Sequence, residues 1–396
     1  MSKSRLQLKY NILQGNFWIT FGITLSFINS YLAGIGLDAQ VIGLIIAVFS
    51  GLAAIAQLFL GKLADRHRKV IWKDILIILI VLRILVNAFL FFVESANLSG
   101  FLFGLMVFLL NAMIPFVNSA TFYYEKSNIE LSFGFARGVG SLFFAVGTFF
   151  VGRWVSNFGI SVILYTGMIA NILLLLSAFS MPIFSKEKTQ VDLLNEPKHS
   201  GNLFKQYPKF VFTLFAFVLL MSFHSNTNTY LLDIFENVGG NNADLGVALA
   251  VAALLEIPIM LGFNYVRKIF KSHQMLVISG LAFLVKGLVY YFASSTTGIY
   301  AAQLTQIFCF SLFASASVYY AREQMPLSRL QQGQSLAAST ITIGSVFGNL
   351  IGGRLIYNYG IKTNIFVMNV LVVIAIIIVI LMKNPPKKEN EVLLEQ

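Results

Sequence analysis

Cysteine is nearly absent from this chain of 396 residues, in which Cys309 is the only one. A single cysteine excludes an internal disulfide framework and any metal site built from several cysteines. The four histidines are scattered without the spacing of metal ligands. Charged residues are also scarce, at 11% against about 25% in a typical soluble domain. This low charge content argues against an ordinary soluble protein.

Long apolar runs are the main feature of the chain. Hydrophobic residues make up 57% of it, and the mean hydropathy is +0.77. The runs reach the length of about 20 residues with which a helix crosses a bilayer. Twelve are expected, at approximately 10–36, 41–64, 74–93, 101–124, 134–157, 160–183, 209–232, 243–266, 274–294, 298–321, 333–357 and 362–382. The first has no small-residue cleavage site, so we predict a transmembrane helix rather than a signal peptide.

The longest polar stretch, 184–208, divides these segments into two groups of six. Continuous apolar runs of this length differ from the ten-residue alternation of a membrane β-barrel. We therefore predict an all-α membrane protein with 12 transmembrane helices in two six-helix bundles, 1–183 and 209–383. Residues 184–208 are predicted to be a cytoplasmic linker, and 384–396 a cytoplasmic tail.

The distribution of Lys and Arg predicts how the chain is oriented. If the N-terminus, every second loop, the linker and the tail share one side, that side holds 21 of the 28 Lys and Arg residues. Only Arg153, Arg354 and Lys362 fall on the other side. By the positive-inside rule, both termini are predicted to be cytoplasmic, in the cell (inner) membrane. Topology accounts for the net charge of +11, so no nucleic-acid partner is expected.

A short basic connector, residues 61–69, joins the second and third segments, and the stretch 262–271 is similar to it at the equivalent place in the second group. Together with the six-plus-six plan, the connector resembles the major facilitator superfamily over the whole chain. The resemblance implies two halves that rock around a central site. It also implies that Gly61, Asp65 and Arg66 take part in conformational gating. The alternative for the basic residues is that they only anchor the topology.

Charged side chains inside the predicted spans are few, and each is costly to place in lipid. Glu256 is the only acidic residue well inside a span, and Lys286 and Arg83 are mid-span bases. Burial disfavours the charged form of a carboxyl and a nearby cation favours it, so we predict that Glu256 couples to protons with Lys286 as its partner. A permanent Glu256–Lys286 ion pair that locks two helices is the alternative. Arg83 is either a substrate anchor or a partner of carbonyls and polar groups in the first helix.

Neutral polar groups inside the spans are candidates for a binding cavity. His224 can titrate near neutral pH, so it is a candidate for proton coupling; a hydrogen-bonding cavity residue is the alternative. Amides and hydroxyls both donate and accept hydrogen bonds, which suits sugars and nucleosides. The alternative for these groups is hydrogen bonding between helices. The predicted cavity residues of this kind are Asn118, Thr121, Asn228, Gln303 and Gln306.

A second resemblance covers residues 125–130 and 133–141. This region resembles helices 4 and 5 of the oligosaccharide:proton symporters, the group that includes lactose permease. The resemblance implies that Arg137 binds sugar hydroxyls through paired donors, and that Phe144 stacks on the face of a pyranose ring.

At other positions the chain departs from that group. Thr121 stands where lactose permease has its sugar-binding glutamate, and Asn228 stands at one of two aspartates of helix 7. Gln303, Gln306 and Cys309 occupy the places of a lysine, a histidine and the proton-carrying glutamate of helix 10. The proton relay of the group is therefore not carried over, and lactose is not assumed as the substrate.

These observations predict a proton-coupled secondary active transporter that imports a neutral polyhydroxylated solute, a sugar or oligosaccharide, by alternating access. The alternatives are a nucleoside:proton symporter, efflux of small amphipathic compounds, and a non-transporting membrane sensor. No nucleophile with a base, metal cluster or phosphate loop points to an enzyme. The proton is the expected coupling ion, with no other cofactor. The expected partners are a small-molecule substrate and the lipid bilayer, and the protein is expected to be a monomer.

Overall fold

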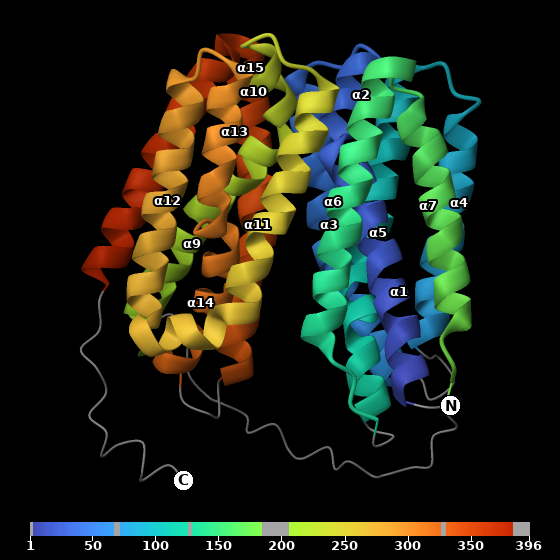
Figure 1. Cartoon of the computed structure of the whole chain (residues 1–396), viewed down its shortest axis with the longest axis horizontal. Helices are drawn as coiled ribbons and strands as arrows, with labels where there is room; N and C mark the ends of the chain where they lie inside the picture. The colour runs from blue at the N-terminus through green and yellow to red at the C-terminus, as the bar shows by residue number, and fades with distance from the viewer. Residues whose placement is uncertain (1–2, 67–71, 126–128, 184–205, 326–329, 383–396) are drawn as a thin grey trace.

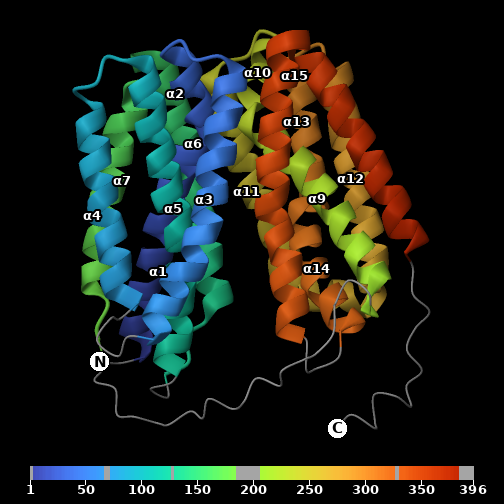
Figure 2. The same ribbon diagram turned by 180° about the vertical axis from the view of Figure 1, so that it is seen from behind.

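The computed structural model describes residues 3–66, 72–125, 129–183, 206–325 and 330–382. Within these ranges the chain forms helices joined by short turns, and no strand is present. Figures 1 and 2 show the helices side by side in two bundles, as the sequence predicts. Most of the predicted linker, 184–208, and the predicted tail, 384–396, lie outside the described residues, so both stay predictions.

The N-terminal bundle contains six spans, of which the first is bent. Helix α1 (Lys3–Phe21) continues through a π-helical turn, η1 (Gly22–Ser26), and α2 (Ile28–Gly34) follows after a bend of 40°. The other five are α3 (Ala39–Arg66), α4 (Trp72–Leu90), α5 (Ala96–Glu125), α6 (Phe133–Phe158) and α7 (Val162–Ser180).

The C-terminal bundle repeats this plan with one interrupted span. Its first span is α9 (Pro208–Thr229), and the short α10 (Leu231–Glu236) follows beyond the end of this span. Helices α11 (Asn242–Ile269) and α12 (Ser272–Phe292) are continuous. The next span is broken into α13 (Thr296–Leu304), a 3₁₀ turn η2 (Thr305–Ile307) and α14 (Phe310–Gln324). Helix α15 (Leu330–Leu381) contains the last two predicted spans.

Gly360 divides α15 into those two spans. Its φ of 80° and ψ of 171° are not helical, and glycine adopts a positive φ without the clash that a Cβ would cause. The predicted segments 333–357 and 362–382 lie on either side of this residue. The structure therefore accommodates all twelve predicted segments.

Membrane insertion is consistent with the lengths and compositions of these helices. Nine described helices are long and apolar enough to cross a membrane, or ten if the bent first span is included. Helix α4 is not among them because it contains three charged residues, Lys73, Asp74 and Arg83. The two bases face the protein, since Lys73 and Arg83 are both buried. The helix is therefore polar on its inner side rather than toward lipid.

The basic connector is more helical than the sequence predicts. Residues 61–66 form the last turns of α3, and 67–71 lie outside the described residues. The side chains of Gly61, Asp65 and Arg66 are likewise not described, so their role in gating stays a prediction.

Three clusters of buried apolar residues show how the bundles meet. One cluster joins residues of both bundles, such as Phe27 and Leu231, toward the upper end of the molecule as Figure 1 is drawn. The other two are each confined to one bundle, with Phe116 in one and Phe217 in the other. The bundles thus share a core at the upper end only, and their ribbons diverge toward the lower end (Figures 1 and 2).

Glycines bring the upper ends into backbone contact. A Cβ atom built on Gly152 of α6 would lie 2.5 Å from the carbonyl oxygen of Asn242 and 2.8 Å from the Cα atom of Gly246, both on α11. A Cβ atom on Gly43 of α3 would collide with the backbone carbonyl of Asn349 on α15. Small residues allow helices to approach this closely in a membrane. The upper end is therefore closed by direct contact between helices of different bundles.

Candidate functional site

A cavity of about 470 Å³ lies between the two bundles, and both bundles line it. Its volume falls within the range of about 300–1,000 Å³ that is usual for small-molecule sites. Six residues predicted for substrate binding or proton coupling line this cavity: Arg137, Phe144, His224, Asn228, Glu256 and Gln306. The cavity is therefore the place where the sequence-based predictions converge.

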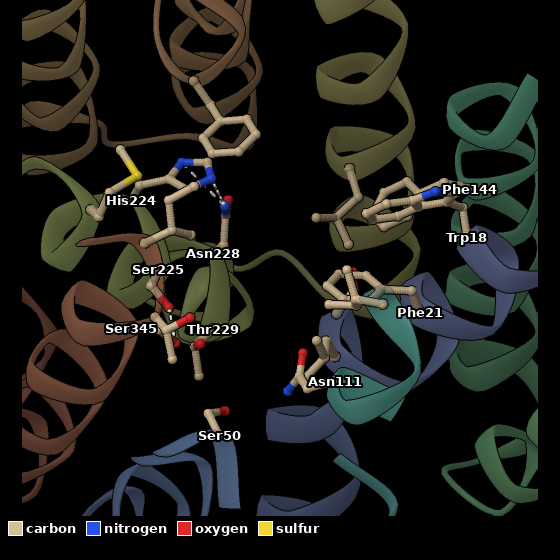
Figure 3. Close-up of a pocket in the computed structure, with 18 of the residues that line it drawn as sticks. Trp18, Phe21, Ser50, Asn111, Phe144, His224, Ser225, Asn228, Thr229 and Ser345 are labelled. Atoms are coloured by element: carbon tan, nitrogen blue, oxygen red, sulfur yellow. Dashed lines mark hydrogen bonds between the residues drawn. The ribbon is translucent and has the colours of Figure 1, made fainter. Parts of the chain in front are cut away.

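One wall of the cavity is aromatic and comes from the N-terminal bundle. Figure 3 shows Trp18, Phe21 and Phe144 on this side. The ring centres of Trp18 and Phe21 are 4.9 Å apart. The flat apolar surface of such rings can stack on a sugar ring or on a nucleobase.

Arg137 is held against this aromatic wall. Its guanidinium carbon lies 3.6 Å from the centre of the Trp18 ring, and its Nη1 atom donates to Ser141 Oγ at 2.9 Å. Trp18 is oriented in turn by a hydrogen bond from its Nε1 atom to Gln14 Oε1 at 3.0 Å. Gly140 makes room for the indole, because a Cβ atom there would lie 2.5 Å from Trp18 Cδ1. The cation–π contact and these bonds fix the guanidinium at the surface of the cavity.

The opposite wall comes from the C-terminal bundle and is more polar. His224 is stacked on Phe310, with ring centres 4.6 Å apart and an interplanar angle of 4°, and its Nε2 atom lies 3.2 Å from Asn228 Nδ2. Below them, Ser225 Oγ donates to Ser345 Oγ at 2.8 Å (Figure 3). This wall presents a flat stack together with hydroxyl and amide groups. The cavity can therefore hold a solute that has both an apolar face and a hydrogen-bonding edge.

Glu256 and Lys286 are connected through Gln306. The Nζ atom of Lys286 donates to Gln306 Oε1 at 2.6 Å, and Gln306 Nε2 donates to Glu256 Oε1 at 2.7 Å. The amide suits this position because its oxygen accepts and its nitrogen donates. Lys286 is only 1% exposed and lies behind the cavity, whereas Glu256 and Gln306 line it. The two charges predicted to be partners are thus linked by a side chain that the sequence suggested only as a substrate ligand.

Glu256 also interacts electrostatically with Arg137. Glu256 belongs to α11 and Arg137 to α6, so this interaction acts between the two bundles. Glu256 therefore lines the cavity and also interacts with a cation of the opposite bundle.

The structure places four other predicted residues away from the cavity. Asn118 Oδ1 accepts from Gln14 Nε2 at 3.3 Å, and Thr121 donates to the carbonyl oxygen of Asn118 at 3.0 Å. Gln303 is buried and donates to the hydroxyl of Tyr290 at 2.8 Å. These residues join helices within one bundle or bond to a carbonyl oxygen of their own helix. Arg83, the fourth, lies inside the N-terminal bundle.

Arg83 is fully buried inside the N-terminal bundle. Its Nε atom donates to Asn171 Oδ1 at 2.7 Å, its Nη1 atom to the carbonyl oxygen of Met106 at 2.5 Å, and its Nη2 atom to Thr24 Oγ1. Three helices around α4 therefore share one guanidinium. The sequence suggests two roles for Arg83, and these contacts are those of the second, a partner of carbonyls and polar groups.

Replacing Arg83 with Met is expected to lower the melting temperature of the purified protein. The acceptors on Asn171 and Met106 would stay buried without their donor, and each such loss costs about 1–3 kcal/mol. Arg153→Met is the matched control, because Arg153 is exposed and its guanidinium lies over Phe149 near the upper end. Equal melting temperatures for Arg83→Met and the control would contradict the structural role.

The sequence did not single out several residues of the site, above all Trp18, Phe21 and Ser50. Trp18 and Phe21 lie in an apolar helix, where aromatic residues usually face lipid and carry no functional signal. A usable signal was present nearby: Gln14, Asn16 and Thr20 are polar residues in the middle of the same span. Polar side chains in a membrane helix face the protein interior, so they mark the inner face of α1.

Comparison with protein-family models gives a match over nearly the whole chain. Residues 10–381 match the MFS_1 like family. Among curated proteins, the "Putative sugar efflux transporter" of Deinococcus radiodurans is 23% identical over 176 residues. That match covers 44% of this chain and 44% of the relative, so less than half of the relative's length is aligned.

Solved structures with the same fold are transporters of different solutes. A point mutant of the nucleoside transporter NupG superposes with a TM-score of 0.81 at 15% identity, covering 96% of this chain and 100% of NupG. A point mutant of the peptide transporter POT, in complex with alafosfalin, gives a TM-score of 0.72 at 11% identity over 96% of this chain and 97% of its own. A bacterial homologue of the lysosomal transporter Spinster, in an inward-facing occupied conformation, gives 0.71 at 13% identity over 96% of each chain. At these identities the likeness shows the fold alone. Because the family model covers residues 10–381, the chain belongs to the MFS_1 like family and is a membrane transporter of the major facilitator superfamily.

Proposed function

We propose that this protein is a proton-coupled symporter that imports a neutral polyhydroxylated solute, a sugar or small oligosaccharide, by alternating access. One observation carries the proposal. The cavity between the bundles contains an aromatic wall with Arg137, a hydrogen-bonding wall, and the carboxylate of Glu256. Solute recognition and a protonatable group are thus found in one place.

The aromatic wall suits the apolar face of a sugar. Trp18 and Phe144 offer ring surface, and the guanidinium of Arg137 offers paired N–H donors for adjacent hydroxyls. Asn228 and Gln306 on the opposite wall supply groups that both donate and accept. A neutral solute fits better than an anion, because Glu256 would repel a negative charge in the same cavity.

Glu256 is the proposed proton carrier. When it is ionised, it accepts from Gln306 and attracts Arg137 of the opposite bundle. Protonation removes the attraction to Arg137 and frees that guanidinium for the solute. Lys286 then holds Gln306 in place through the other end of the amide. A proton and a solute are thereby coupled through one residue, Arg137.

With the predicted orientation, the upper end of the molecule faces the outside. The helices of the two bundles are in backbone contact there, at Gly152 and Gly43, so this structure corresponds to a conformation open toward the cytoplasm. In alternating access, these contacts separate so that the cavity opens to the outside. A proton that moves inward down the membrane potential gains about 2.3 kcal/mol per 100 mV.

A nucleoside:proton symporter is the second candidate. The parallel stack of His224 and Phe310 favours it, because a nucleobase can extend such a stack while Asn228 binds its polar edge. The structurally similar NupG is a nucleoside transporter. The sugar is preferred because Arg137, stacked on Trp18, presents paired donors that suit the adjacent hydroxyls of a sugar.

Uptake into proteoliposomes tests the proposal. With an inward proton gradient, a labelled sugar from a panel of mono- and disaccharides is expected to accumulate severalfold, and an uncoupler is expected to abolish the accumulation. The same vesicles with the gradient reversed serve as the control for direction. Accumulation of nucleosides alone would support the second candidate instead. Solute export driven by the reversed gradient, as the name of the Deinococcus relative suggests, would contradict import.

A further inference from the structure

A second partly buried carboxylate, besides Glu256, lies outside the cavity. Asp233 is on α10, beyond the end of the span Pro208–Thr229 and at the upper end of the molecule (Figure 1). It is partly buried, and its Oδ2 atom accepts a hydrogen bond from Asn29 Nδ2. Asn29 belongs to α2 of the other bundle. Asp233 therefore takes part in the contact that closes the upper end.

Other bonds between the bundles surround this contact. The hydroxyl of Tyr230 donates to the carbonyl oxygen of Ala39 at 3.1 Å. Ser156 Oγ on α6 donates to Asn241 Oδ1 at 3.2 Å and accepts from the backbone N–H of Ala243 at 2.8 Å. These contacts join neutral groups, whereas Asp233 contributes an ionisable one.

The ionisable groups around α10 are acidic or phenolic. The described ones are Glu236 on α10 itself, Tyr230 before it, Asp244 at the start of α11, Tyr300 on α13 and Asp38 after α2. The carboxylate of Asp244 is occupied, since Tyr300 donates to its Oδ1 atom at 2.6 Å and the backbone N–H of Asn241 to its Oδ2 atom at 2.9 Å. Asp233 therefore has a neutral hydrogen-bond donor, Asn29, and an acidic neighbour, Glu236.

Burial raises the pKa of the Asp233 carboxyl to about 6, against its ordinary value of 3.8. The hydrogen bond from Asn29 opposes this rise, and the negative charge of Glu236 adds to it. When the bundles separate at the upper end, Asp233 loses its burial and its pKa returns toward the ordinary value. The closed end therefore binds a proton more tightly than the open end, and by linkage a bound proton stabilises the closed end.

We propose that Asp233 is a second proton-binding site, which takes up a proton from the outside as the upper end closes. Protonation of Asp233 in the contact with Asn29 would then accompany the step that carries the solute from an outward-open to an inward-open conformation. The inference rests on the proposed function in that closure of the upper end is a step of transport and that this end faces the outside. It does not depend on the identity of the solute or on coupling by Glu256.

The distance between spin labels on the two bundles tests this site directly. Labels at Asn97→Cys and Ser294→Cys, both exposed at the upper end, report on closure in a Cys309→Ala background. The variant Glu256→Gln is included throughout, so that titration in the cavity does not contribute. When the pH is lowered from 8 to 5, the ratio of closed to open molecules is expected to rise about tenfold. This value follows from a pKa of about 6 for Asp233 in the closed form and the ordinary carboxyl pKa of 3.8 in the open form.

In Asp233→Asn, the pH response is expected to disappear, and the closed form at pH 8 is expected to be at least as populated as at pH 5 without the substitution. Asn29→Leu removes the donor to the carboxylate, so its pH response should exceed tenfold. This second variant keeps the test valid if Asp233→Asn fails to fold. Glu236→Gln, on the same helix but exposed, should keep most of the response. A response that persists in Asp233→Asn, or that is absent before substitution, would overturn the proposal.

Discussion

The Glu256→Gln variant is expected to exchange solute across the membrane but not to accumulate it. Gln has nearly the shape of a protonated Glu and still meets Gln306, but it cannot release a proton. The variant should therefore bind solute and change conformation while the proton gradient does no work on it. At a membrane potential of 100 mV, one coupled proton supports a ratio of inside to outside solute of roughly 50. In Glu256→Gln this ratio should fall to about one.

Two measurements on reconstituted protein separate coupling from binding. Counterflow, in which unlabelled solute inside exchanges with labelled solute outside, should be preserved in Glu256→Gln. Accumulation driven by an imposed proton gradient should be lost. Glu94→Gln is the matched control, since Glu94 is exposed between α4 and α5 and should leave both activities unchanged. Undiminished accumulation by Glu256→Gln would refute the coupling role.

Gln306 adds a second test of the same mechanism. Because its amide is bonded to both Lys286 and Glu256, Gln306→Leu should separate the two charges without removing either. The cation would then lie beside an apolar side chain, and Glu256 would lose its donor. Accumulation should decline, while the charge of the cavity stays the same. A role for Gln306 as a solute ligand alone would instead weaken counterflow and accumulation together.

The fold follows from the sequence because lipid restricts the possible structures. A buried backbone in a bilayer must satisfy its own hydrogen bonds, so each long apolar run becomes a helix. What the runs could not predict is where helices bend or end. The π-helical turn at Gly22–Ser26 lies within a continuous apolar run, and α3 continues to Arg66, two residues past the predicted end of its segment at 64. Both features depend on packing and on contact with water, which hydropathy does not encode.

The sequence predicted only part of the site, namely residues whose charge or motif marks them as facing the protein interior. Glu256 was found because a charge in lipid is costly, and Arg137 was found through the resemblance to the oligosaccharide:proton symporters; both line the cavity. The cost of a charge in lipid also selected Arg83, which is buried within one bundle instead. A charge indicates that a side chain avoids lipid. It does not indicate whether the side chain faces the cavity between the bundles or the interior of one bundle. That choice depends on the rotation of each helix about its axis, and the position of Gln306 between two charges depends on it as well.

Gly152→Leu is expected to prevent closure of the upper end and to abolish accumulation. Gly152 lies on α6, and the backbone of α11 is so close that a Cβ atom would sit 2.5 Å from the carbonyl oxygen of Asn242. Backbone atoms cannot rotate away as a side chain can, so the helices must separate by about 1 Å or more to restore ordinary contact. Because α6 and α11 belong to different bundles, that separation opens the upper end.

Spin labels at Asn97→Cys and Ser294→Cys again provide the measurement. Their distance should increase in Gly152→Leu and should no longer shorten when solute is added. Gly138→Leu is the matched control on the same helix, since a Cβ atom there meets no other atom within 4 Å, and the distance should stay unchanged. A loss of transport alone would not distinguish an arrested carrier from an unfolded one. An unchanged distance in folded Gly152→Leu would show that the contact between α6 and α11 does not hold the upper end closed.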